Sequence, residues 1–185
     1  MRTAILLPAR FLSASFILIF MLITSFTNTG KFTITSTVFT HNGAIPSKYS
    51  CEGTGTNPPL HIGGAPSGTR SFALIVHDPD ALVKNGFTHW VMWNIELDGE
   101  IPEEFKGAEQ GLNSAKEQGF KGMCPPSGTH HYIFKVYALD TKLSLDAAST
   151  DKATLESAMK GHILASDELV GTYKKVRNYT TEADK

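Results

Sequence analysis

The stretch that decides the fold is residues 72–95, FALIVHDPDALVKNGFTHWVMWNI. Two short runs in it, 72–76 and 89–95, are apolar and rich in β-branched and aromatic residues, and turn-forming residues separate them. Runs of this kind predict two buried strands. Acidic residues close the first run at 77–80 and His89 opens the second, so antiparallel pairing would bring these ends together. Ionisable groups at the mouth of a buried sheet are costly unless they pair or bind something, which makes this edge the predicted site.

The composition is that of an ordinary globular domain. The chain has 185 residues, of which 41% are hydrophobic and 19% charged, and its formal net charge is −1. Residues 31–185 carry 15 Lys and Arg against 18 Asp and Glu, a net charge of −3, with no run of basic residues. This balance argues against nucleic acid as a partner.

Residues 1–30 are predicted to stand apart from the fold as a signal peptide. Arg2 and Arg10 precede or flank an uncharged apolar stretch, residues 11–24, which is short for a membrane span of about 20 residues. The best small-x-small cleavage site is Ser-Phe-Thr at 25–27. We therefore expect a periplasmic or secreted protein, with an uncleaved membrane anchor through residues 11–24 as the alternative.

The two cysteines, Cys51 and Cys124, are far apart in the sequence. In an exported protein an even number of cysteines favours a disulfide between them. Two separate buried thiols are the alternative, because the sequence does not show whether their Cα atoms come within bridging distance.

Periodicity extends the β reading over much of the chain. Residues 31–40 alternate as a strand with one wet face does, and residues 168–176 are typical of a last strand. Residues 151–165 instead carry apolar side chains at helical spacing. Many short strands and one late helix predict a mainly β fold, an antiparallel β-sandwich with one amphipathic C-terminal helix.

One domain is expected over residues 31–185, because no internal repeat interrupts it. Residues 98–121 are polar and rich in glycine, without sustained periodicity. A loop of this length inside a compact domain is usually functional, so it is a candidate recognition loop for a protein partner. The sequence leaves the oligomeric state open, with a homodimer among the possibilities.

Five side chains at strand ends form the candidate site. Residues 130–139 predict a further strand, whose period of two turns His130 and Tyr132 to the same side. Two imidazoles and a phenol can donate to an anion, and a carboxylate beside them would orient an imidazole. The five residues are Asp78, Asp80, His89, His130 and Tyr132. The expected apolar walls are Phe87, Trp90, Pro125 and Pro126.

Catalytic and metal chemistry fit the sequence less well. No His-Glu-x-x-His or Cys-x-x-Cys spacing predicts zinc, and no Gly-x-Ser-x-Gly elbow predicts a serine hydrolase. Cys124 lies near His130, but its neighbouring prolines favour a structural role over that of a nucleophile. We therefore assign no catalytic residue, no metal and no cofactor, and keep an Asp/His hydrolase as the least favoured function.

Four segments in order resemble the phosphatidylethanolamine-binding protein family. They are SFALIVHDPDAL (71–82), HWVMWNI (89–95), GMCPPSGTHHYIFKVYALD (122–140) and AMKGHILASDELVGTY (158–173). The combination is specific, and the resemblance runs from Phe39 to Tyr173. It is strongest with the bacterial and archaeal branch, often called Raf-kinase-inhibitor-like.

The resemblance implies Greek-key connections and a small anion pocket made by Asp78, His89, His130 and Tyr132. Asp80 and the turn at Pro125-Pro126 would lie beside it. Two positions depart from the family pattern: Leu82 replaces a proline, and His131 replaces an arginine. The expected function is binding of phosphate or a phospholipid headgroup without catalysis. The alternative is a protein-interaction module that inhibits a kinase or protease through residues 98–121.

Overall fold

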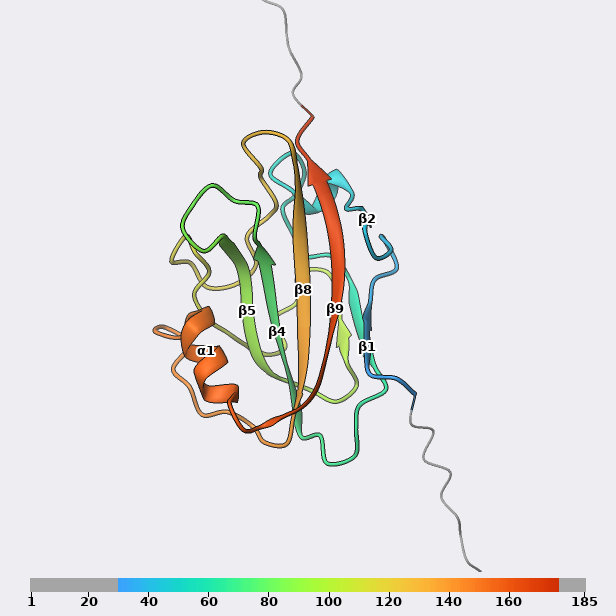
Figure 1. Cartoon of the computed structure of the whole chain (residues 1–185), viewed down its shortest axis with the longest axis vertical. Helices are drawn as coiled ribbons and strands as arrows, with labels where there is room; N and C mark the ends of the chain where they lie inside the picture. The colour runs from blue at the N-terminus through green and yellow to red at the C-terminus, as the bar shows by residue number, and fades with distance from the viewer. Residues whose placement is uncertain (1–29, 177–185) are drawn as a thin grey trace, which may run out of the picture.

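Two β-sheets and one helix make up the computed structural model, which describes residues 30–176 (Figure 1). The larger sheet has the strand order β2-β9-β8-β4-β5-β7, and the smaller has the order β1-β3-β6. The predicted mainly β fold with a single α-helix is confirmed. The elements are β1 (Thr33–Thr35), β2 (Gly43–Ala44), a 3-10 turn (Ser47–Tyr49), β3 (Leu60–Gly63), β4 (Ser71–Asp78), β5 (Phe87–Ile95), β6 (Glu100–Ile101), β7 (Glu109–Gln110), β8 (Thr129–Leu139), α1 (Lys152–Met159) and β9 (Ile163–Lys174).

Strands β4 and β5 form the antiparallel pair that the apolar runs predicted. Their register runs from Phe72 opposite Ile95 to Asp78 opposite Phe87, so Asp78 and the start of β5 share one end of the sheet. The connecting turn needs Gly86, which has a φ of +71°. A Cβ there would lie 2.4 Å from the Asp78 carbonyl oxygen, closer than any side chain allows.

The sequence prediction placed the end of the helix too late. α1 ends at Met159, and Ile163 and Leu164, which had been counted with it, open β9. Ladder pairing with β8 accounts for the difference, since Ile163 lies opposite Leu139. Tertiary pairing here outweighs the local helical period.

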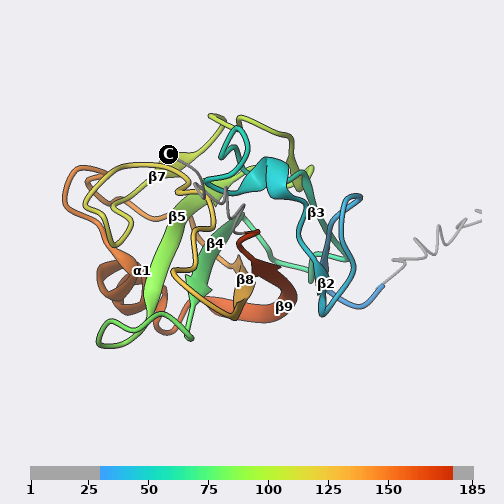
Figure 2. The same cartoon turned by 90° about the horizontal axis from the view of Figure 1, so that it is seen from above.

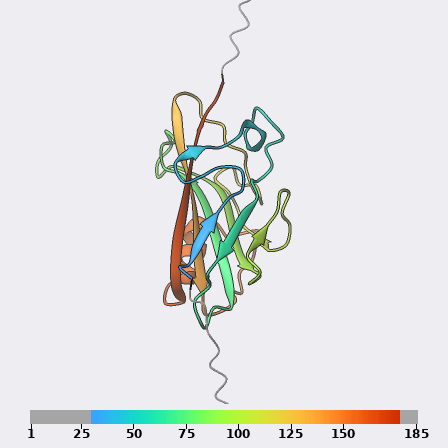
Figure 3. The ribbon, with the colours of Figure 1, turned by 90° about the vertical axis from the view of Figure 1, so that its right-hand side faces the viewer.

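Figures 2 and 3 show the small sheet, the larger sheet and α1 as successive layers. Two hydrophobic clusters lie between these layers. The larger cluster lies between the two sheets, where Leu74 and Phe134 of the larger sheet meet Ile62 of the smaller. The smaller cluster covers the opposite face of the larger sheet, where Leu155 and Met159 of α1 lie among its strands' side chains. Within residues 30–176 no helix is long and apolar enough to cross a membrane.

The sandwich is not purely antiparallel, which corrects the sequence prediction. β2 pairs parallel with β9, and the hydrogen bonds from Asn42 N–H to Val170 O and from Ile45 N–H to Thr172 O extend this pairing. The approach is so close that a Cβ on Gly171 would lie 2.5 Å from Ile45. A short segment without a strand pattern can pair in this way because its own backbone supplies the contacts.

Residues 98–121 are less irregular than the sequence predicted. β6 pairs with β3 and β7 pairs with β5, so both sheets draw on this segment. Ile101 is buried in the core between the sheets, and Asn113 is buried as well. The segment is thus tied to the sandwich at several points, and its role as a recognition loop for a protein partner stays a prediction.

Candidate anion-binding site

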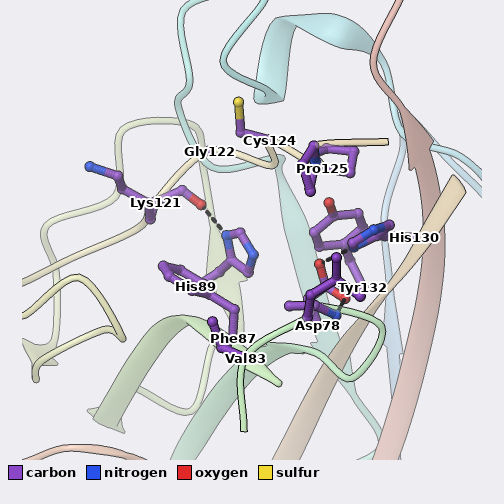
Figure 4. Close-up of a pocket in the computed structure, with 13 residues that line it drawn as sticks. Asp78, Val83, Phe87, His89, Lys121, Gly122, Cys124, Pro125, His130 and Tyr132 are labelled. Atoms are coloured by element: carbon purple, nitrogen blue, oxygen red, sulfur yellow. Dashed lines mark hydrogen bonds and ion pairs between the residues drawn. The ribbon is translucent and has the colours of Figure 1, made fainter. Parts of the chain in front are cut away.

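A hollow of about 320 Å³ opens at the end of the larger sheet where β4 ends and β5 and β8 begin. Its lining residues come from three segments, within residues 78–89, 121–126 and 130–132. The close-up in Figure 4 shows imidazole, phenol and carboxylate groups around it. Asp78, His89, His130 and Tyr132 all line this hollow, so the structure brings together four residues that the sequence separates by up to 54 positions.

Asp78 and His130 form a buried pair at the base of the hollow. His130 Nδ1 lies 2.8 Å from Asp78 Oδ2, and the two side chains are only 7% and 4% exposed. The backbone N–H groups of Asp80 and Ala81 donate to Asp78 Oδ1 at 2.8 and 3.1 Å. These bonds hold the carboxylate in place, and it in turn requires a proton on His130 Nδ1. The other ring nitrogen, Nε2, then has a lone pair when the ring is neutral.

His89 owes its position to a β-bulge. Val76 pairs with Trp90 and His77 pairs with Thr88, so the ladder between β4 and β5 skips His89. A bulge of this kind redirects a side chain out of strict alternation. The His89 ring packs edge-on against the Tyr132 ring, with centroids 5.2 Å apart.

The tautomer of His89 is set by the main chain. Its Nδ1–H donates to the Lys121 carbonyl oxygen at 2.7 Å, as drawn in Figure 4. A carbonyl can only accept, so Nδ1 carries the proton and Nε2 is the acceptor in the neutral ring. Burial lowers the pKa of His89, partly offset by the Lys121 carbonyl and by the charge of Asp78.

The Tyr132 hydroxyl is a buried polar group without a settled partner. Its oxygen is inaccessible to solvent and makes no hydrogen bond of good geometry to any residue between 30 and 176, although the Asp78 carboxylate lies close enough to accept weakly from it. Burial raises the pKa of Tyr132, and the nearby Asp78 carboxylate raises it further. The phenol therefore stays protonated and can donate. A buried hydroxyl in this state is costly unless something else accepts from it.

The wall opposite β4 is held by a disulfide. Cys51 and Cys124 are bonded, with their Cα atoms 5.4 Å apart, which settles the alternative left open by the sequence. Cys124, Pro125 and Pro126 all line the hollow. Together with Val83 and Phe87 they make most of the wall apolar.

Two expected wall residues lie elsewhere. Trp90 is fully buried between the sheets, where its indole N–H donates to Gln110 Oε1 at 2.8 Å, and it does not line the hollow. The bulge at His89 explains the position of Trp90. Because of the extra residue, His89 and Trp90 both turn toward the layer between the sheets, where Trp90 belongs to the core and His89 lines the hollow. Asp80 also lies outside the hollow, where it accepts from the backbone and imidazole of His131.

Some groups at the site carry no signal in the sequence. The Lys121 carbonyl oxygen fixes His89, but a main-chain group cannot be recognised from side-chain chemistry. The Lys121 amine bonds Glu117 at 2.8 Å and points away from the hollow in Figure 4. Leu82 and Val83 complete the rim. The resemblance to the family had already singled out Leu82, whereas Val83 carries no signal beyond its position in the same turn.

The arrangement offers a donor and two imidazoles that can gain a proton, but no fixed cation. In the part of the chain that the structure describes, no three His, Cys, Asp or Glu side chains are placed to hold a metal ion. A neutral imidazole Nε2 accepts a proton or a hydrogen bond, and a protonated one donates. The groups around the hollow can therefore donate to a ligand or accept from it, depending on whether the imidazoles are protonated.

The fold and the hollow define a mainly β sandwich protein with a pocket at one end of its larger sheet, and comparison with known proteins gives its family. The model of the phosphatidylethanolamine-binding protein family matches residues 35–174. The chain therefore belongs to this family.

Relatives and solved structures agree with that assignment. A UPF0098 protein of Pyrococcus horikoshii is 47% identical over 151 residues, which are 76% of this chain and 75% of the relative. The crystal structure of a phosphatidylethanolamine-binding protein homologue from Chlamydia trachomatis superposes with a TM-score of 0.76 at 40% identity, covering 78% of this chain and 98% of that one. YbcL of E. coli, described as a member of the mammalian family, gives a TM-score of 0.73 at 32% identity, covering 80% and 100%.

Proposed function

We propose that this protein is a non-enzymatic binding protein whose hollow takes a phosphate-type anion, either free or as the headgroup of a phospholipid. The observation that carries the proposal is the gathering of two imidazoles, a phenol and a carboxylate around one mostly apolar hollow, with the Asp78–His130 pair buried at 2.8 Å. Protonated imidazole Nε2 atoms would donate to an oxyanion there, and the Tyr132 hydroxyl would exchange its poor contact with Asp78 for a hydrogen bond to the anion. The apolar wall of Val83, Phe87 and Pro125 would take the carbon part of an amphiphilic ligand.

Proton uptake should accompany binding. His130 Nδ1 is occupied by Asp78 and His89 Nδ1 by the Lys121 carbonyl, so each ring can donate to an anion only through a protonated Nε2. The lowered pKa of His89 keeps that ring neutral at pH 7 in the empty site. Anion affinity should therefore rise as the pH falls.

Sulfate and phosphate separate the two ways of meeting this requirement. Sulfate carries no proton in this pH range, so it needs a protonated imidazole, whereas phosphate can donate its own P–O–H to a neutral one. We expect calorimetry to show that sulfate binding weakens steeply between pH 5.5 and pH 8, a range that extends roughly one pH unit or more on either side of the ordinary imidazole pKa. Phosphate binding should weaken less over the same range. Equal and flat profiles for both anions would contradict the assigned roles.

Tyr132→Phe tests the phenol directly. Loss of one donor hydrogen bond to a charged ligand should weaken phosphate binding roughly tenfold, while stability changes by less than about 1 kcal/mol because the contact of the hydroxyl with Asp78 is poor. His162→Gln is the matched control. That imidazole also bonds a carboxylate, Asp140, but it is exposed and lies outside the hollow. Unchanged affinity in Tyr132→Phe would exclude the phenol from the proposed anion site.

Location and partners belong to the same proposal. The apolar segment 11–24 lies outside the described residues, and we place the protein in the periplasm or outside the cell on its sequence alone. A disulfide at the wall of the hollow suits such an oxidising compartment. The family is named for phospholipid binding, which supports a headgroup as one source of the anion. Inhibition of a kinase or protease stays a prediction without a structural argument.

A further inference from the structure

An exposed apolar rim surrounds the mouth of the hollow. Leu82 and Val83, in the loop between β4 and β5, are 88% and 56% exposed. Both also line the hollow, as does the exposed Pro126 on the other side of its mouth. Apolar side chains gathered around a binding hollow, without a core to cover, mark a surface that meets a partner.

A polar groove with three lysines lies next to this rim. It has a volume of about 240 Å³, and Lys84, Lys116 and Lys152 line it. Residues 81–83 line the first hollow and residues 84–86 the second, so one loop separates them. The apolar rim and the lysines therefore belong to one side of the molecule.

The acidic groups nearby leave this groove with excess positive charge. Lys152 is paired with Glu156 at 2.7 Å, but neither Lys84 nor Lys116 makes an ion pair with any residue between 30 and 176. Asp151 is the one acid that lines the groove, and it accepts from the Thr154 N–H as the N-cap of α1. The hydrogen bond from Thr154 and, to a smaller degree, the charge of Lys116 lower the pKa of the Asp151 carboxyl. Three lysines against Asp151 and Glu156 leave the groove a net charge of +1 to attract an external anionic surface.

We propose that the loop of residues 81–86 is a membrane-docking tip that presents the hollow to a bilayer containing anionic phospholipids. Leu82 and Val83 would enter the boundary between headgroups and acyl chains, and Lys84 and Lys116 would face the anionic headgroups. An apolar tip flanked by basic residues is the pattern by which proteins bind such an interface. The inference rests on the proposed function in one respect, namely that a headgroup then enters the hollow.

The position of the tip makes this geometry productive. Since Leu82 and Val83 form the rim itself, their insertion would bring the mouth of the hollow to the level of the headgroups. A phospholipid could then place its phosphate near Tyr132 while its chains stay in the bilayer. A protein partner would need a larger buried patch than this rim offers, about 800 Å² on each side.

A tryptophan placed at the tip tests the proposal in the full chain. Trp90 and Trp93 are both fully buried and give a constant background, so a new tryptophan reports its own surroundings. With vesicles of phosphatidylcholine mixed with phosphatidylglycerol, the emission of Leu82→Trp should shift to the blue and be quenched by brominated acyl chains. The matched control is Leu97→Trp, which is exposed by 49% in the wild type but follows β5 at the opposite end of the sheet. No shift or quenching at position 82, or equal responses at both positions, would overturn the proposal.

The lysines are tested on the same background. Lys84→Gln with Lys116→Gln, added to Leu82→Trp, should raise the lipid concentration at half-maximal shift roughly fivefold for each lysine. Added salt should have the same effect on the chain that retains both lysines, because the attraction is screened. Unchanged lipid affinity in the double variant would reject the lysines as part of the tip.

Phosphate calorimetry on the same protein separates this inference from the proposed function. A tip that responds to vesicles in a protein that binds no phosphate would leave the docking surface standing and refute the anion site. Phosphate binding with a silent tip would do the reverse.

Discussion

Two carboxylate–imidazole pairs of similar geometry connect the end of β4 to the start of β8, and they differ in burial. Asp78 and His130 are 2.8 Å apart with side chains 4% and 7% exposed, whereas Asp80 and His131 are 2.7 Å apart with side chains 41% and 53% exposed. The period of two along β8 sends its successive histidines to opposite sides. The comparison teaches that burial, rather than the contact itself, gives a carboxylate–imidazole pair its weight in stability, and of the two pairs it is the buried one that lines the hollow.

The largest change in stability is expected when the disulfide that holds one wall of the hollow is removed. The disulfide from Cys51 to Cys124 spans 73 residues of sequence, so its loss in Cys51→Ser with Cys124→Ser should lower the free energy of unfolding by about 4 kcal/mol through chain entropy. Because Cys124 lines the hollow, phosphate binding should weaken as well. Urea unfolding and calorimetry measure the two effects. A loss of stability below about 1 kcal/mol would mean that the rest of the fold already restrains this wall.

Breaking the buried pair is expected to have the next largest effect. Asp78→Ala removes the acceptor of His130 and of two backbone N–H groups, and should cost about 3 kcal/mol in urea unfolding. Phosphate affinity should fall too, because His130 loses the group that orients it. Stability close to that of the wild type would show that the pair is no better than its exposed neighbour.

Acidification should lower stability through buried imidazoles. Burial lowers the pKa of His89, and also that of His77 on the other side of the turn. In the unfolded chain each takes up a proton near pH 6.5, about its ordinary pKa, and in the folded chain only at lower pH. The free energy of unfolding should therefore fall as the pH drops below about 6.5 and level off below the folded pKa values.

Variants assign this pH dependence. Thermal unfolding of His89→Gln and His77→Gln between pH 8 and pH 5 (roughly the imidazole range) should show a shallower loss in each, and saturating sulfate should reduce the loss only where His89 is present. An unchanged pH profile in both variants would exclude these imidazoles as its source.

The exposed pair should give the smallest effect. Asp80→Ala removes a solvent-exposed pair and should change stability by less than about 1 kcal/mol. Hydrogen bonds from His131 lower the pKa of Asp80, but solvent weakens their contribution. Phosphate binding should persist. Measured beside Asp78→Ala in the same urea series, an equal loss in both variants would refute the role given to burial.

The sequence predicted the parts of the site that follow from strand pairing. The apolar runs of β4 and β5 placed Asp78 beside the start of β5, and the period of β8 placed His130 and Tyr132 on one face, as the structure has them. Alternation along β5 could not predict the bulge that turns His89 inward, because the extra residue depends on the register with β4. The error at Trp90 has the same source.

Other elements could not be predicted from the sequence, because main-chain pairing defines them. The two-residue strands β6 and β7 follow no apolar period, and pairing with β3 and β5 defines them. The sequence predicts helix at the start of β9, because Ile163 and Leu164 continue the spacing of the apolar residues of α1. In each case a partner strand far away in sequence decides the structure, and such partners leave no local trace.

The parallel pairing of β2 with β9 also covers an edge of the larger sheet. Residues 42–45 cover the outer edge of the last long strand at 170–172, where open N–H and C=O groups would otherwise invite a second chain. Residues 42–45 thus protect β9 from edge-to-edge aggregation. We expect a chain without the β2–β9 pairing still to fold, but to pair with its own copies along the exposed edge of β9.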